Sequence, residues 1–236
     1  MKRILLFLLP LLVFLLSARP LMGQIKMPPR NEMHQDSSLT AFICKLQYAI
    51  YKKDTRFLLS VVDKNIKNSF GGSNGIEEFK SMWELDKPDS EVWFYLSKLI
   101  SLGGTFGGDA PYSTFILPYV FSMDLPNDTL DPFSVMVVTG EGVNVREKPD
   151  KSAKVLGQLS YEVVEVDYEK SYPSFQEEKI AHLSYYGTKE WYYVTTLNQK
   201  LRGYVYWDYI WSPIDYRLFL EKKQGQWKIT ILVAGD

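Results

Sequence analysis

Alternating valines near the middle of the chain limit its fold more than any other stretch does. Val143 and Val145 are separated by polar residues, which is the two-residue period of a half-buried strand. Pro149 ends this strand, because proline has no backbone N–H to donate to a neighbouring strand. Similar apolar runs follow at 155–159, 163–166, 191–194 and 203–206. Short strands separated by turn residues predict a small all-β barrel or sandwich.

The order of these segments resembles that of a bacterial SH3 domain (SH3b). The residues that carry the resemblance are Val143-Asn144-Val145-Arg146, Pro149, Val155-Leu156-Gly157-Gln158-Leu159, Trp191-Tyr192-Tyr193-Val194, Gly203-Tyr204-Val205 and Tyr209-Ile210. The resemblance implies a small SH3-like barrel over residues 136–211. Two departures from the family's pattern lie near the region where such domains bind ligands. Of the family's properties, binding specificity is therefore the one that the resemblance implies least for this chain. Ser160-Tyr161-Glu162 replaces the usual turn glycine, and residues 167–190 form a long insertion.

The first 23 residues have the layout of a secretory signal peptide. Basic residues come first, an apolar run follows at 4–16, and the segment ends in the small residue Gly23. We expect cleavage between Gly23 and Gln24, which predicts an exported protein, either periplasmic or secreted. The apolar run is shorter than the roughly 20 residues that span a bilayer, so no stable membrane span is expected after cleavage. A retained N-terminal anchor is the alternative.

Charge and cysteine content narrow the function classes further. Without Lys2, Arg3 and Arg19 the exported chain has 24 basic and 28 acidic residues, a net charge of −4. This balance gives no broad basic surface for nucleic acid. Cys44 is the only cysteine, so no intramolecular disulfide forms. Its neighbours carry no nucleophile motif, and we interpret it as a small apolar residue on a helix.

The region before the barrel is predicted to be mainly helical. Residues 24–36 show little apolar periodicity and are expected to be a flexible leader. The domain predicted over 37–131 then contains four helices and one strand. The first helix is expected to be capped by Ser37 or Ser38, and the second, capped by Asp54, to carry residues 57–62. The third is expected to be capped by Asn74, and the fourth to open at 88–90 and stop at Gly103. A loop at 103–108 is then expected to lead to a strand at 115–121 that is bent by Pro118.

The last segment, 214–236, is predicted to be a β-hairpin. Residues 216–220 and 227–233 alternate in polarity around a turn at 223–226. An order with helices first and a hairpin last resembles the nuclear-transport-factor-2-like fold, in which a curved sheet packs on N-terminal helices. The resemblance implies that the hairpin returns to pack on residues 37–131. The expected fold class is therefore α+β, with the SH3-like barrel inserted in it. The alternative is three consecutive pieces with little contact between them.

No catalytic constellation is apparent in the sequence. His34 and His182 have no ligand-type neighbours, so we expect no metal site. The glycine-rich stretch 71–75 lacks the lysine and Ser/Thr of a phosphate loop, and no cofactor is expected. Adjacent acidic pairs such as Glu77-Glu78 point in different directions. A non-enzyme is predicted; a hydrolase with carboxylates far apart in the sequence stays open as an alternative.

Aromatic residues of the last strands are the predicted ligand-binding set. Strand alternation places Val205 inward and therefore Tyr204 and Tyr206 outward. Trp191 is expected in the core, and Arg146 is expected to fix its own turn in preference to binding a ligand. The candidate binding residues are Tyr204, Tyr206, Tyr193, Trp207 and Tyr209.

Together these observations predict an exported, non-enzymatic binding protein. The SH3b resemblance implies that its partner is peptidoglycan, bound as cell-wall glycopeptide, or a peptide segment of an envelope protein. The alternative is an envelope protein–protein interaction scaffold in which the barrel docks on the helical domain.

Overall fold

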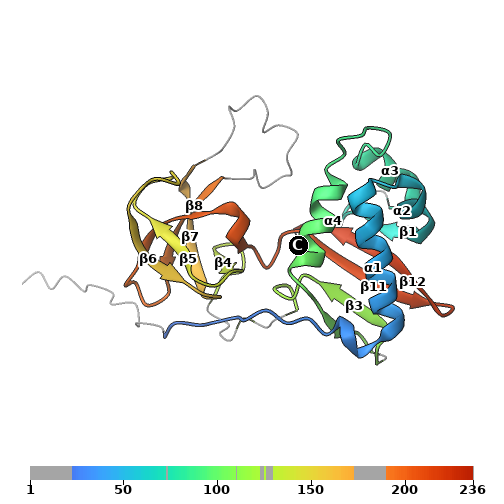
Figure 1. The fold of residues 1–236 in the computed structure, drawn as a ribbon, viewed down its shortest axis with the longest axis horizontal. Helices are drawn as coiled ribbons and strands as arrows, with labels where there is room; N and C mark the ends of the chain where they lie inside the picture. The colour runs from blue at the N-terminus through green and yellow to red at the C-terminus, as the bar shows by residue number, and fades with distance from the viewer. Residues whose placement is uncertain are drawn as a thin grey trace, which may run out of the picture.

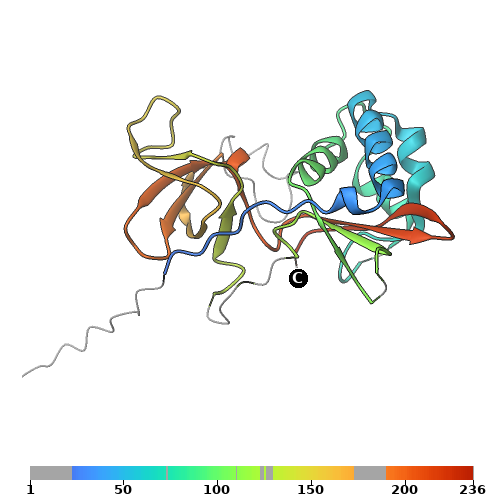
Figure 2. The same cartoon turned by 60° about the horizontal axis from the view of Figure 1, so that its bottom comes forward.

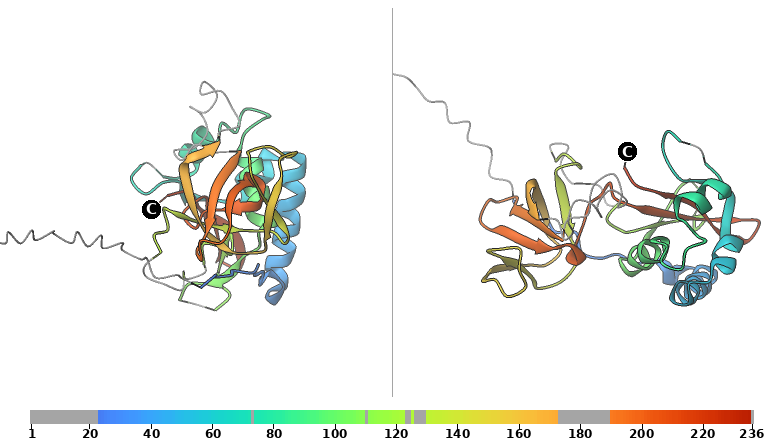
Figure 3. Two further views of the ribbon diagram at one scale, coloured as in Figure 1. Left: turned by 90° about the vertical axis from the view of Figure 1, so that its left-hand side faces the viewer. Right: turned by 90° about the horizontal axis from the view of Figure 1, so that it is seen from above.

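The computed structural model describes residues 23–72, 74–109, 111–122, 125, 130–172 and 190–235. These residues form a mixed α+β structure with four α-helices and two sheets, which confirms the predicted class. The five-stranded sheet has the order β1-β12-β11-β3-β2, and the seven-stranded sheet has the order β10-β4-β7-β8-β9-β5-β6. The two sheets lie at opposite ends of an elongated molecule (Figures 1 and 3).

The elements follow in chain order. The helices are η1 (Met33–Gln35), α1 (Ser37–Lys52), α2 (Thr55–Val61), α3 (Ile76–Met82), α4 (Val92–Ser101) and η2 (Trp207–Tyr209). The strands of the five-stranded sheet are β1 (Val62–Lys67), β2 (Thr105–Gly107), β3 (Thr114–Leu117), β11 (Arg217–Lys223) and β12 (Gln226–Val233). Those of the seven-stranded sheet are β4 (Val135–Val138), β5 (Val143–Arg146), β6 (Val155–Leu159), β7 (Val163–Tyr172), β8 (Trp191–Thr196), β9 (Arg202–Tyr206) and β10 (Ile210–Trp211).

The five-stranded sheet combines strands from both ends of the chain. β11 and β12 pair antiparallel from Arg217↔Val233 to Lys223↔Gln226. The two residues between them, Gln224 and Gly225, both have positive φ, which suits the tight turn of a twisted strand pair. β12 then pairs parallel with β1, and β11 pairs antiparallel with β3. The chain therefore leaves this sheet after β3, builds the other sheet and returns.

One apolar core extends from the helices into the seven-stranded sheet. α1 and α4 lie on the same face of the five-stranded sheet (Figure 2) and bury their apolar faces against it. The same cluster of buried side chains includes Val135, Val137, Val163 and Trp211 from the second sheet. A separate core, built around Val145, Val164, Val194 and Val205, fills the inner face of the seven-stranded sheet. The two sheets are thus joined by buried apolar contacts as well as by the chain.

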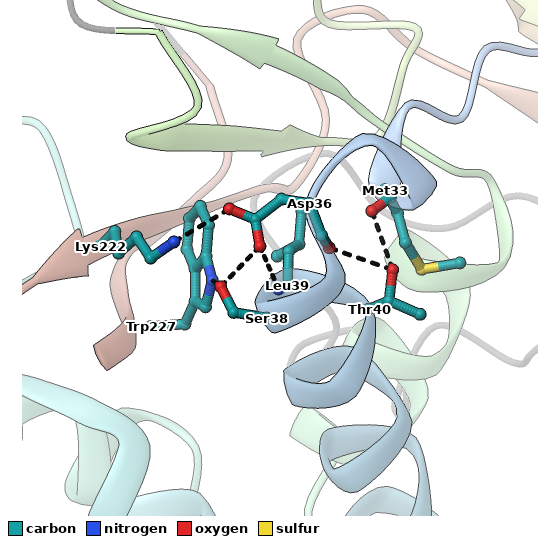
Figure 4. A network of polar contacts seen from close by, with 7 residues as sticks. All are labelled: Met33, Asp36, Ser38, Leu39, Thr40, Lys222 and Trp227. Atoms are coloured by element: carbon teal, nitrogen blue, oxygen red, sulfur yellow. Dashed lines mark hydrogen bonds and ion pairs between the residues drawn. The ribbon is translucent and has the colours of Figure 1, made fainter. Parts of the chain in front are cut away.

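The first helix begins at Ser37, within the predicted start, but its N-cap lies one residue before the predicted caps. Asp36, not Ser37 or Ser38, is the N-cap of α1, and its Oδ1 accepts a hydrogen bond from the Leu39 N–H at 3.0 Å (Figure 4). Ser38 instead donates its hydroxyl to Asp36 Oδ1 at 2.5 Å. A carboxylate is favoured over a hydroxyl here because it also attracts Lys222 of β11, whose Nζ lies 2.9 Å from Oδ2.

Other boundaries also differ from the sequence-based expectation. The second helix ends at Val61, and 62–67 form strand β1, because β12 offers this segment a parallel partner. α3 is capped by Gly75, while Asn74 uses its side-chain oxygen to accept from the Asn68 N–H. The predicted loop at 103–108 contains β2, which pairs with β3. β3 itself stops at Leu117, directly before Pro118.

The predicted flexible leader is wrong. Met27 is 2% exposed, its N–H donates to the carbonyl of Tyr161 at 2.7 Å, and its own carbonyl accepts from the Tyr119 hydroxyl at 3.1 Å. Lys26 pairs with Glu162 at 3.1 Å. The segment runs from the seven-stranded sheet to the start of α1 (Figures 1 and 2). Partners distant in the sequence hold it, so local periodicity could not indicate its order.

The seven-stranded sheet is open. β6 pairs only with β5 and β10 only with β4 among the described strands, so no pairing closes the sheet into a barrel. The predicted insertion begins later than residue 167, because β7 continues to Tyr172 and pairs with β8. Residues 173–189 of the insertion and residues 1–22 of the predicted signal peptide lie outside the described residues. Within the described residues, none of the helices is long and apolar enough to cross a bilayer.

Candidate functional site: an aromatic cleft on the seven-stranded sheet

A cleft of about 420 Å³ opens on the outer face of the seven-stranded sheet. Its side chains come from β5, the loops on either side of it, the start of β8, the end of β9 and η2. The lining residues are Glu141, Gly142, Val143, Asn144, Arg146, Lys151, Trp191, Tyr206 and Tyr209. The cleft therefore combines three aromatic rings with charged groups of both signs.

Strand alternation separates most of the cleft side chains from the core, and Val143 borders both. In β5, Val143 and Val145 are buried, while Asn144 and Arg146 are half-buried on the opposite face. In β9, Val205 is fully buried in the core, and Tyr204 and Tyr206 alternate with it. Successive side chains of a strand point to opposite faces, so β5 and β9 each supply valines to the core and polar or aromatic side chains to the cleft. The core valines thus fix the strands that carry the cleft.

Glycine brings β9 close to β5 beside the cleft. Gly203 has φ +153°, and a Cβ at this position would lie 2.5 Å from the carbonyl oxygen of Arg146. Only a residue without a side chain allows this approach. Arg146 is paired with Tyr204 in the register of the two strands. The close approach therefore places the β5 side chains next to the aromatic side chains of β9.

The aromatic rings of the cleft lie close together, one pair edge to face and the other tilted. The centroids of Trp191 and Tyr206 are 5.2 Å apart at an interplanar angle of 62°. Tyr209 follows at 6.4 Å from Tyr206. The ammonium group of Lys151 lies 4.5 Å from the Tyr206 centroid, within cation–π distance. These contacts fix the rings before a ligand arrives, which lowers the entropy lost on binding.

Polar residues complete the cleft. Arg146 donates from Nη1 to the carbonyl of Ala153 at 2.7 Å, which braces the 147–154 loop as predicted for this residue. Asn144 Oδ1 accepts from Gln158 Nε2 at 3.0 Å. Asp150 accepts from the hydroxyl and the N–H of Ser152, and these bonds lower the pKa of Asp150. The loop that carries Lys151 is thus held on both sides.

The predicted binding residues divide into three groups. Tyr206 and Tyr209 line the cleft. Tyr193 and Tyr204 form an edge-to-face pair, 5.1 Å apart, on the same outer face of the sheet but beside the cleft. Trp207 points elsewhere, toward α4, where its ring lies 5.5 Å from that of Phe94.

Trp191 is buried, as predicted, but it lies on the cleft side of β8 and belongs to neither apolar cluster. It is 4% exposed, but Tyr192 and Val194 occupy the core face of β8, so Trp191 faces the cleft. The face of Trp191 follows from its pairing with Tyr206 across β8 and β9. This pairing cannot be read from the alternation within one strand. Glu141 and Lys151 come from loops and carried no sequence signal.

Side chains that could hold a metal ion do not converge in the described part of the chain. No three His, Cys, Asp or Glu side chains there are arranged to hold a metal ion. Cys44 is exposed on α1, and His34 lies next to the Asn31 carbonyl, both far from the cleft in the sequence. His182 lies outside the described residues. The cleft offers stacking surfaces and charge pairing, which are means of recognition.

No protein-family model matches the chain, and no curated protein and no solved structure is similar to it.

Proposed function

We propose that the protein is an exported, non-enzymatic binding protein whose seven-stranded sheet is an SH3-like module for cell-wall glycopeptide. The observation that carries the proposal is the cleft in which Trp191, Tyr206 and Tyr209 meet Glu141, Arg146 and Lys151. Aromatic faces hold the apolar faces of sugar rings, and tyrosine and tryptophan add polar handles. The signal-peptide layout of residues 1–23 supports encounter with the wall.

The charges of the cleft favour a glycopeptide over a neutral glycan. Arg146 and Lys151 suit the carboxylates of a wall peptide, and Glu141 suits its amino group. A volume of about 420 Å³ accommodates a ligand segment of one or two residues. The ligand thus matches the cleft in ring stacking, in charge and in size.

Co-sedimentation with purified peptidoglycan tests the proposal. Residues 24–236 are expected to bind the wall with saturation. Tyr206→Ala/Tyr209→Ala removes two of the three rings, and we expect affinity to fall at least about tenfold, since aromatic stacking contributes on the order of 1 kcal/mol per ring. Circular dichroism of the variant verifies that the sheet is still folded.

Tyr51→Ala is the matched control, because Tyr51 is 79% exposed on α1 and lies outside the cleft. It is expected to bind like the wild type. Absence of saturable binding by the wild-type chain, or equal losses in the cleft and control variants, would exclude the wall-ligand function.

An envelope scaffold is the second candidate, favoured by two contacts between α4 and η2. Lys98 of α4 donates to Asp208 at 2.7 Å, and Phe94 contacts Trp207. In this function the seven-stranded sheet docks on α4, and the outer partner is a protein. Peptidoglycan binding distinguishes the candidates, because the scaffold has no reason to bind the purified wall.

A further inference from the structure

An apolar stripe runs along the solvent side of α1. Ala41, Cys44, Tyr48 and Tyr51 are all exposed and are spaced by three, four and three residues. This spacing is that of the a and d positions of a heptad, which form one continuous seam on a helix. Tyr48 is 65% exposed and Tyr51 79% exposed. The opposite side of α1 already fills the core, so the helix has apolar residues on two faces.

A groove lies beside this stripe, between α1 and α4. Its volume is about 300 Å³, and it is bounded by Gln47, Ile50 and Tyr51 on α1 and by Ser97, Ile100 and Ser101 on α4. The two serines are one helical turn apart, and their small side chains leave space between the helices. Tyr51 belongs to both the stripe and the groove. The two features therefore form one continuous surface, and the stripe lies on the side of α1 opposite its buried residues.

The charge along this surface has one sign. Residues 37–53 contain Lys45, Lys52 and Lys53 and no Asp or Glu. Within the described residues, none of the ion pairs involves Lys45 or Lys52. The Lys52 ammonium group lies 5.0 Å from the Tyr51 centroid and 5.8 Å from the Tyr48 centroid. Cation–π contact thus keeps this lysine beside the stripe.

We propose that this surface docks an amphipathic helix of a partner protein, with an apolar seam and acidic flanks. The seam matches the stripe, one of its side chains enters the groove, and its acids pair with Lys45 and Lys52. A second copy of the chain is a poorer occupant, because two α1 helices would bring lysines of the same charge together. The inference is independent of wall binding, which uses the other end of the molecule.

A designed peptide provides the direct test. The probe is a fluorescein-labelled helix of about three heptads with leucine at a and d and glutamate at the flanking positions. A second probe carries lysine in place of each glutamate. Fluorescence anisotropy is expected to show saturable binding of the acidic peptide. Lys45→Glu/Lys52→Glu is expected to weaken this binding at least tenfold and to improve binding of the basic peptide.

Two variants control for trivial effects. Lys154→Glu/Lys200→Glu makes the same change of net charge on the seven-stranded sheet and is expected to leave peptide binding unchanged. Tyr48→Ser/Tyr51→Ser removes the rings but keeps the lysines, and it is expected to abolish binding. The proposal is overturned by absence of binding up to about 1 mM peptide, or by equal binding of the acidic and basic peptides. A wild-type chain that sediments as a dimer and is dissociated by Tyr51→Glu would also overturn it, since the occupant would then be a second copy.

Discussion

Asp36 holds α1 to the hairpin strand β11 through one carboxylate. The Ser38 hydroxyl, the Lys222 ammonium group and the Leu39 N–H all donate to it, which keeps the pKa of Asp36 well below its ordinary range (Figure 4). Asp36→Asn keeps the size and loses the charge. We expect the free energy of unfolding at pH 7 to fall by about 1 kcal/mol, because the charge that attracts Lys222 and the helix dipole is lost while asparagine still caps the helix. Urea unfolding measures the difference.

The pH dependence has a defined sign. Because the pKa of Asp36 is lower in the folded state, its contribution is complete above about pH 4 and disappears as the pH falls further. The difference between wild type and Asp36→Asn should therefore narrow in acid. Glu77→Gln, an equal loss of charge in the first turn of α3, should cost less than about 0.5 kcal/mol. Equal losses in both variants would contradict a special stabilising role for the charge of Asp36.

Single residues also show where sequence reasoning ends. Val205 was predicted to point inward, with Tyr204 and Tyr206 outward as a consequence, and Val205 is fully buried. Trp191 was predicted in the core, and it is buried, but Tyr192 takes the core position of that strand. Alternation sends adjacent residues of a strand to opposite faces, but it does not say which face is the core. Where both adjacent residues are aromatic, as at 191 and 192, hydrophobicity does not identify the one that points to the core. The choice depends on the neighbouring strand, where Tyr206 pairs with Trp191.

At the scale of elements, the approach of β9 to β5 depends on Gly203. An added Cβ would meet the Arg146 carbonyl oxygen at 2.5 Å and a Val145 methyl group at 2.9 Å, with φ at +153°. Gly203→Ala is therefore expected to cost about 2–3 kcal/mol in unfolding free energy. It should also weaken peptidoglycan binding, because the two strands that supply Arg146 and Tyr206 must separate.

Gly71→Ala is the control for this element, since its Cβ would meet nothing within 4 Å. Unfolding in urea and wall co-sedimentation are measured on both variants. A Gly203→Ala protein as stable as the control would show that β5 can move away from β9 at little cost.

Elements were predictable where the pattern was local and not where a partner decided the outcome. The apolar spacing of α1 and the Asp54 cap of α2 are local features, and both helices form. Val62 was predicted to belong to the second helix, but residues 62–67 form β1, because β12 supplies parallel hydrogen bonds. The same reason explains β2, which forms only because β3 lies beside it.

At the scale of the whole molecule, the N-terminal segment and the shared core join the two sheets. Met27 hydrogen-bonds to Tyr161 next to β7 and to Tyr119 after β3, and its side chain lies in the cluster that also holds Val135 and Val163. Burial raises the pKa of Tyr119 to about 12, which keeps its hydroxyl protonated as the donor of this bond. Cooperative unfolding of both sheets is the expected consequence.

Met27→Ala tests this coupling, because it removes a side chain that is 2% exposed at the junction and leaves the backbone bonds. We expect a loss of about 2–4 kcal/mol from the cavity. Hydrogen exchange followed by segment should show β5–β6 and β11–β12 losing protection at the same, lower urea concentration, since the cavity weakens a core that both sheets share. Met82→Ala, at a methionine that is 40% exposed on α3, should change stability by less than about 0.5 kcal/mol. Loss of protection in one sheet while the other keeps its wild-type midpoint would mean that the sheets are independent and that the N-terminal segment merely lies on their surfaces.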